Sequence, residues 1–193
     1  MTVLAIDTAS RHRLVVLRAG RGGDLVAART AAGGAALPWL DGSLVELGVS
    51  GVEAVVVVTG PGSYTGLRAG IAVGLGVAHT LGLPLHGVSS LEVAARSVPD
   101  GRTEILALVE AGRGGAYAGR FLRREGILEM IGEARRVSLA SVALAAPPPV
   151  TLDALELPGL LPGDPVRALA AAIPAALGRP ALRLAGLVAT YLD

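Results

Sequence analysis

The stretch VVVVTGPGSYTG, residues 55–66, constrains the fold most strongly, because a run of valines meets a glycine-rich turn there. Residues 55–59 are β-branched with no polar alternation, which predicts a strand buried on both faces of a sheet. The apolar segment after the turn has helical length, spans residues 66–81 and stops at Gly82. A buried strand, a tight turn and a helix predict a βα unit of an α/β protein.

Further elements on both sides of this unit suggest two related lobes. In the first half, apolar periodicity predicts strands over residues 3–6, 14–17, 25–28 and 85–88, with helices over 37–47 and from Ser89 or Ser90 to Arg96. This order is that of a ribonuclease H-like unit. After VPDGR a fainter copy follows, with strands over 105–109, 116–122 and 127–131 and helices over 138–145 and 166–177. We therefore expect lobes at residues 1–98 and 99–193, the second one reduced.

Composition excludes several classes of function. The net charge is +1, and one Trp, three Tyr and one Phe are too few for the basic, aromatic surface of a dedicated RNA-binding protein. Without cysteine, no disulfide, thiolate nucleophile or cysteine-based zinc site can form. The uncharged run at residues 69–85 is interrupted by Gly, Pro and His79 and is too short to span a bilayer. With no secretory signal either, we expect a cytoplasmic protein without a membrane segment.

The turn GPGSYTG and the segment IDTAS are candidates for a nucleotide or anion site. Gly60, Gly62, Ser63 and Thr65 precede a helix whose N-terminal amides could hold phosphate, although neither a P-loop nor a dinucleotide motif is matched. A tight connection between strand and helix is the favoured alternative for this turn. Asp7 and Thr8 end the first predicted strand, where kinases and actin-like ATPases hold phosphate. A structural Asp that caps the hairpin is the favoured alternative there.

The sequence supports neither a histidine-based metal site nor a catalytic serine nucleophile. The three histidines, His12, His79 and His86, have no metal-ligand spacing. No G-x-S-x-G segment supplies a nucleophile elbow. We expect no catalytic residue, no metal and no cofactor.

A stripe of small residues marks the helix after the turn. Gly66, Gly70, Gly74, Ala78 and Gly82 recur every fourth residue. Glycine inside a helix costs about 1 kcal/mol relative to alanine, so the stripe needs a packing reason. Close approach of the chain's own sheet and close approach of a partner chain explain it equally well.

These residues resemble the bacterial TsaB (YeaZ) family. The match rests on LAIDTAS and GPGSYTGLRAGIAVGLGVAHTLGLPLHGVSSLE and weakens after residue 96. VEAGRGGAYAGRF is similar to the family's D-A-R-x-G-E-V-Y segment, with Glu110, Gly112 and Gly115 in place of Asp, Arg and Glu. AAGGAALP lacks the family's usual histidine, and YLD is similar to the family's Y-L-R ending.

The resemblance implies two ribonuclease H-like lobes of the actin/Hsp70/sugar-kinase (ASKHA) type and a role in making threonylcarbamoyladenosine in tRNA. In that pathway TsaB subunits are non-catalytic and pair with the catalytic subunit TsaD, and TsaE joins as an ATPase. TsaD binds metal through H-L-E-G-H. Here the corresponding stretch reads Ser90-Leu91-Glu92-Val93-Ala94, in which both histidines are replaced.

We therefore expect a non-catalytic subunit that pairs with a TsaD-type subunit, meets a TsaE-type ATPase, contacts tRNA only through the complex, and forms a homodimer when alone. The alternative is an active nucleotide-dependent enzyme of the ATPase or kinase type. Partner contacts are expected on the two helices of the first lobe, at Leu40, Leu44, Leu67, Gly70, Val73, Gly74 and Val77. Gly74→Arg is then expected to abolish pairing without unfolding the lobe.

Overall fold

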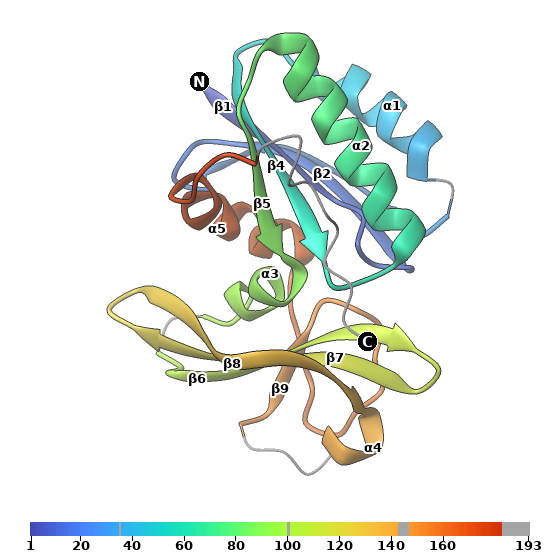
Figure 1. Cartoon of the computed structure of the whole chain (residues 1–193), viewed down its shortest axis with the longest axis vertical. Coiled ribbons are helices and arrows are strands. Elements are labelled where there is room, and N and C mark those ends of the chain that lie inside the picture. The colour runs from blue at the N-terminus through green and yellow to red at the C-terminus, as the bar shows by residue number, and fades with distance from the viewer. Residues whose placement is uncertain (35, 100, 143–146, 183–193) are drawn as a thin grey trace.

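Two five-stranded mixed sheets form the two lobes of the chain (Figure 1). The computed structural model describes residues 1–34, 36–99, 101–142 and 147–182. Within this part of the chain, no helix is long and apolar enough to cross a membrane. The predicted helix end at residue 145 and the YLD ending lie outside the described residues.

The first sheet has the strand order β3-β2-β1-β4-β5. Its strands are β1 (Thr2–Asp7), β2 (Arg13–Ala19), β3 (Leu25–Ala32), β4 (Val52–Gly60) and β5 (Leu85–Ser89). The first three strands form an antiparallel meander, and β4 and β5 run parallel to β1. This is the predicted arrangement, although β3 continues four residues beyond its predicted end.

The second sheet repeats this order as β10-β9-β6-β7-β8. Its strands are β6 (Glu104–Gly112), β7 (Gly115–Arg124), β8 (Ile127–Ser138), β9 (Pro149–Thr151) and β10 (Leu161–Pro162). The first three again form a meander, and β9 runs parallel to β6. The predicted fold class is therefore confirmed: two ribonuclease H-like lobes of the ASKHA type. The second is reduced, with strands of three and two residues where the first has nine and five.

Helices cover both faces of the first sheet. α1 (Ala36–Leu47) and α2 (Tyr64–Leu81) lie on one face, and α5 (Pro165–Leu177) lies on the other (Figure 1). The alternating valines of β4 explain why both faces need a cover. Val55 and Val57 belong to the core under α1 and α2, whereas Val56 and Val58 belong to the core under α5. The strand is thus buried on both faces, as its composition predicts.

Each half of the chain contributes a helix to the sheet of the other half. α3 (Ser90–Arg96) lies between the lobes (Figure 1), and its Leu91 packs with Ile105 and Phe121 of the second sheet. In return α5, which follows β10, packs Leu169 and Ile173 into the core of the first sheet. The division at residues 1–98 and 99–193 therefore stays a prediction. The two cores do not separate at that point in the sequence.

Candidate functional site

The GPGSYTG turn fits closely against the loop between β1 and β2. Gly60 has a φ of 111°, which favours glycine, and the Gly60–Pro61 peptide bond is cis. A methyl group on Gly62 would come within 2.5 Å of the Ala9 carbonyl oxygen, and one on Gly66 would overlap the carbonyl oxygen of Thr8. The glycines of this turn thus allow one backbone segment to lie on another.

This contact uses groups that an anion would need. The backbone N–H of Ser63 donates to the Ala9 carbonyl at 2.7 Å. The Ser63 side chain is the N-cap of α2 and accepts from the N–H of Gly66 at 3.4 Å. Thr65 is exposed. The structure therefore places the residues of the predicted anion site in a connection between strand and helix, and anion binding there stays a prediction.

Asp7 and Thr8 are both buried and both have partners. One oxygen of Asp7 accepts from the N–H of Ala9 at 2.9 Å, and the other lies 3.0 Å from Nη2 of Arg13. The hydroxyl of Thr8 donates to the carbonyl of Gly66 at 2.6 Å. The Asp7 carboxylate is therefore ion-paired with Arg13. The hydrogen bond of Thr8 connects the end of β1 to the first turn of α2.

The stretch that resembles the H-L-E-G-H motif supplies no pair of metal ligands. Ser90 is buried and donates to the carbonyl of Pro61, and Ala94 is packed in the core of the second lobe. Glu92 is ion-paired with Arg96 at 2.9 Å and with Arg179 at 2.6 Å. In the part of the chain that the structure describes, no group of three His, Cys, Asp or Glu side chains could hold a metal ion.

The glycine stripe of α2 faces the chain's own first sheet. A methyl group on Gly70 would overlap the hydroxyl of Thr8, and one on Gly74 would overlap Cγ1 of Val57. Leu40 and Leu67, which were also expected to meet a partner, are fully buried in this chain's own core. The prediction that these four residues meet a partner is corrected accordingly, because this chain's own sheet and core already cover them. Leu44, Val73 and Val77 are half-buried and pack beside the core under α1 and α2.

The opposite stripe of α2 is the exposed one. Residues advance by 100° around a helix, so positions two before each glycine lie roughly on the far side. Those positions are Tyr64, Arg68 and Ala72, and all three are exposed, as is Gly76. On α1 the exposed residues Leu37, Asp41 and Val45 recur at the same four-residue spacing. We call these seven residues the outer helix face.

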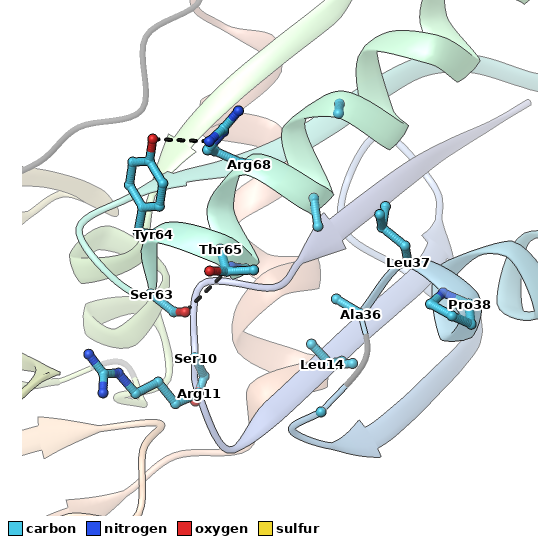
Figure 2. Close-up of a pocket in the computed structure, with 14 residues that line it drawn as sticks. Ser10, Arg11, Leu14, Ala36, Leu37, Pro38, Ser63, Tyr64, Thr65 and Arg68 are labelled. Carbon is cyan, nitrogen blue, oxygen red and sulfur yellow. Dashed lines mark hydrogen bonds between the residues drawn. The ribbon is translucent and has the colours of Figure 1, made fainter.

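A pocket of about 750 Å³ opens between the first turns of α1 and α2 (Figure 2). Leu37 and Pro38 line it from α1, and Tyr64, Arg68 and Ala72 line it from α2. The Arg68 guanidinium donates to the hydroxyl of Tyr64 at 3.0 Å and lies 5.2 Å from the centre of its ring. On the outer helix face Leu37, Val45 and Tyr64 expose 56%, 78% and 56% of their surface. This face is therefore largely apolar, with one basic side chain, Arg68, and one acidic side chain, Asp41.

Sequence reasoning missed this stripe, although the spacing of Tyr64 and Arg68 carried a signal. An aromatic residue and a cation four positions apart share one helix face and can stack. It also missed Arg13, the partner of Asp7. The only signal in the sequence is that Arg13, in the segment RHR, follows a few residues after the first predicted strand, which ends at Asp7.

Comparisons with known proteins agree with the fold and with the motifs. The family model described as TsaD, tRNA N6-adenosine threonylcarbamoyltransferase, matches residues 34–170. The chain is 37% identical over 86 residues to the Bacillus subtilis tRNA threonylcarbamoyladenosine biosynthesis protein TsaB, which is 45% of this chain and 38% of that protein. It is 36% identical over 93 residues to the Escherichia coli protein of the same name, or 46% and 40% of the two chains. The aligned part thus spans about two fifths of each relative.

A solved YeaZ structure from Pseudomonas aeruginosa has the same fold. It superposes with a TM-score of 0.74 at 23% identity and covers 99% of both chains. The family model matches well over half of this chain. The chain belongs to the TsaD-type threonylcarbamoyltransferase family, within its TsaB (YeaZ) members.

Proposed function

We propose that this protein is a non-catalytic subunit of the tRNA N6-threonylcarbamoyladenosine modification complex, which pairs with a TsaD-type catalytic subunit and activates it. The named relatives from B. subtilis and E. coli are biosynthesis proteins of that modification. The observation that carries the proposal is the outer helix face, an exposed and largely apolar surface on two adjacent helices of the first lobe.

The absence of catalysis is proposed from the groups at the two places where chemistry was expected. The Asp7 carboxylate is paired with Arg13, and Ser90 and Ala94 stand where a TsaD-type protein has metal-binding histidines. An active ATPase or kinase would need an available carboxylate for the metal–phosphate group. We therefore favour the subunit over the enzyme, and expect no magnesium-dependent ATP binding by the isolated protein.

In the proposed mechanism the subunit acts as a scaffold. Leu37, Val45 and Tyr64 are exposed apolar side chains. Covering them with a partner removes apolar surface from water, which lowers the free energy of the complex. A partner helix that packs over α1 and α2 would be held in one orientation, which positions the catalytic subunit and its threonylcarbamoyl-adenylate site. Val73, Val77 and Leu44 then lie at the bottom of the contact, below the outer helix face.

The further partners belong to the same proposal. A TsaE-type ATPase joins the pair, and tRNA is contacted through the complex in the cytoplasm. In the absence of TsaD, the outer helix face of one copy covers that of a second copy. Because both associations use one surface, the homodimer must dissociate before the heterodimer forms.

Two substitutions to arginine test this surface. Ala72→Arg and Gly76→Arg each place a long cation on the outer helix face, and Gly76 has open space beside it. Each variant should lose co-elution with the TsaD-type subunit and should no longer support tRNA modification by it. The melting temperature should stay within about 2 °C of the wild-type value, as expected for exposed helix positions.

The matched control is Val26→Arg, which adds the same charge at an exposed site on β3. This variant should bind and activate the partner normally. Unchanged affinity of both Ala72→Arg and Gly76→Arg, measured by calorimetric titration, would overturn the proposed interface. Full tRNA modification by the TsaD-type subunit without this protein would overturn the proposed function.

A further inference from the structure

Arg13, the first residue of β2, is a half-buried arginine that contacts both lobes. Nη2 of Arg13 lies 3.0 Å from Oδ2 of Asp7 in the first lobe, and Nη1 lies 3.5 Å from Oδ1 of Asp153, just after β9 in the second lobe. Nη1 also donates to the carbonyl of Leu152. One guanidinium therefore contacts two carboxylates that come from different lobes.

Both carboxylates are fixed in place by backbone groups. The second oxygen of Asp7 accepts from the N–H of Ala9 at 2.9 Å, and the second oxygen of Asp153 accepts from the N–H of Glu110 at 2.8 Å. The side chains of Asp7 and Asp153 expose 3% and 4% of their surface, and that of Arg13 exposes 15%. Each carboxylate thus has one oxygen held by its own lobe and one turned toward the shared arginine.

The two residues before Arg13 extend this contact. Nε2 of His12 lies 2.9 Å from Oε2 of Glu110 on β6. The guanidinium of Arg11 lies against Gly112, at 3.4 Å from the position of a methyl group on that glycine. The whole RHR segment of the first lobe is therefore placed along the end of β6 in the second lobe.

Two buried carboxylates that contact one guanidinium depend on its positive charge. Their mutual repulsion and their loss of water would otherwise favour opening of the seam, by which we mean the contact between the two lobes. A divalent cation with carboxylate ligands could supply that charge. In this chain a covalently attached guanidinium supplies it, and its planar fork can bind two carboxylates at once.

From this arrangement we infer that Arg13 is an internal cation that locks the two lobes together and takes the position a divalent metal ion would need. The seam between the lobes then closes without metal or nucleotide, and the wild-type protein holds one interlobe arrangement whatever ligands are present. This inference concerns the seam alone and does not depend on the proposed function.

The test replaces the internal cation and offers an external one. Arg13→Ala leaves Asp7 and Asp153 without the guanidinium that both carboxylates contact. In metal-free buffer its melting temperature should fall by roughly 5–15 °C, as expected when one partner of a buried ion pair is removed. Its radius of gyration from small-angle scattering should increase. Addition of 10 mM MgCl₂ should reverse a large part of both changes, because Mg²⁺ can bind the two carboxylates and stabilises the state that it binds.

Controls separate this effect from a general loss of structure. Wild-type protein should show neither change with MgCl₂, and Arg21→Ala, which removes an exposed arginine paired with Glu53, should behave like wild type. The double variant Arg13→Ala with Asp153→Asn should be more stable than Arg13→Ala in metal-free buffer, and should lose the magnesium response. If Arg13→Ala does not fold, Arg13→Lys replaces it, with a smaller loss and a smaller response.

Three results would overturn the inference. The first is a melting temperature of Arg13→Ala within 1 °C of wild type, because the arginine would then not stabilise the contact between the lobes. The second is a destabilised variant that magnesium does not restore. The third is a wild-type protein whose melting temperature rises with MgCl₂, because its seam would then still accept a metal ion.

Discussion

At the scale of single residues, the glycines of α2 differ in what surrounds them. Gly74 lies over Val57 of β4, and a methyl group there would overlap the valine side chain. Gly76, two residues later, has nothing within 4 Å of the same position. Gly74→Arg is therefore no clean test of partner binding, because the arginine would have to displace the sheet under the helix.

A pair of alanine substitutions tests this difference. Gly74→Ala should destabilise the protein by about 1–3 kcal/mol, because the added methyl group forces α2 away from β4. Gly76→Ala should leave stability unchanged or raise it by up to about 1 kcal/mol, because alanine favours the helix and meets no neighbour. Urea denaturation measures both values. Equal effects of the two substitutions would contradict the orientation of α2.

The same glycines show how far the site could be predicted from sequence. Their four-residue spacing correctly predicts a helix that packs closely along one stripe. It does not tell whether a sheet or a partner approaches that stripe, because both need small residues at the same positions. The pairing of Arg13 with Asp153 was beyond prediction for another reason, since these two residues lie 140 positions apart.

At the scale of elements, strong periodicity or strong capping made a segment predictable. The βα unit around β4 and α2 combines a valine run, a capping serine and a terminal glycine, and its predicted ends differ from the observed ones by three residues at most. β9 and β10 were missed because they have three and two residues and lie among prolines. β8 continues to Ser138 through the mostly polar segment GEARRVS. It can do so because it is an exposed edge strand, which needs few apolar side chains.

The cap of α5 gives a prediction at this scale. Oδ1 of Asp164 accepts from the N–H groups of Val166 and Arg167 at 2.9 and 3.1 Å. Asp164→Ala should therefore lower the free energy of unfolding by about 1 kcal/mol, the usual loss for an N-cap. Arg167→Ala removes a side chain that is 86% exposed, and should change stability by less than about 0.5 kcal/mol. Urea denaturation of both variants checks this, and a cap variant as stable as wild type would contradict it.

At the scale of the whole molecule, the exchange of helices makes each lobe depend on the other. α5 belongs to the C-terminal half but covers the first sheet, whereas α3 belongs to the N-terminal half and packs on the second. The contact of Arg13 with Asp153 adds an ionic link across the same seam. Neither sheet retains a complete core if the other half unfolds. We therefore expect the two lobes to unfold together.

Leu169 on α5 offers the sharpest test of this coupling. Its side chain is fully buried under the first sheet although it lies in the second half of the sequence. Leu169→Ala should cost about 3 kcal/mol and lower the melting temperature by roughly 6–12 °C. Calorimetry should show one transition in both proteins, since the first lobe loses its cover when α5 detaches. The fluorescence of Trp39, which lies on α1 beside the core under α1 and α2, should change at the same temperature. Two separate transitions, with only one of them shifted by the substitution, would mean that the lobes are independent despite the exchanged helices.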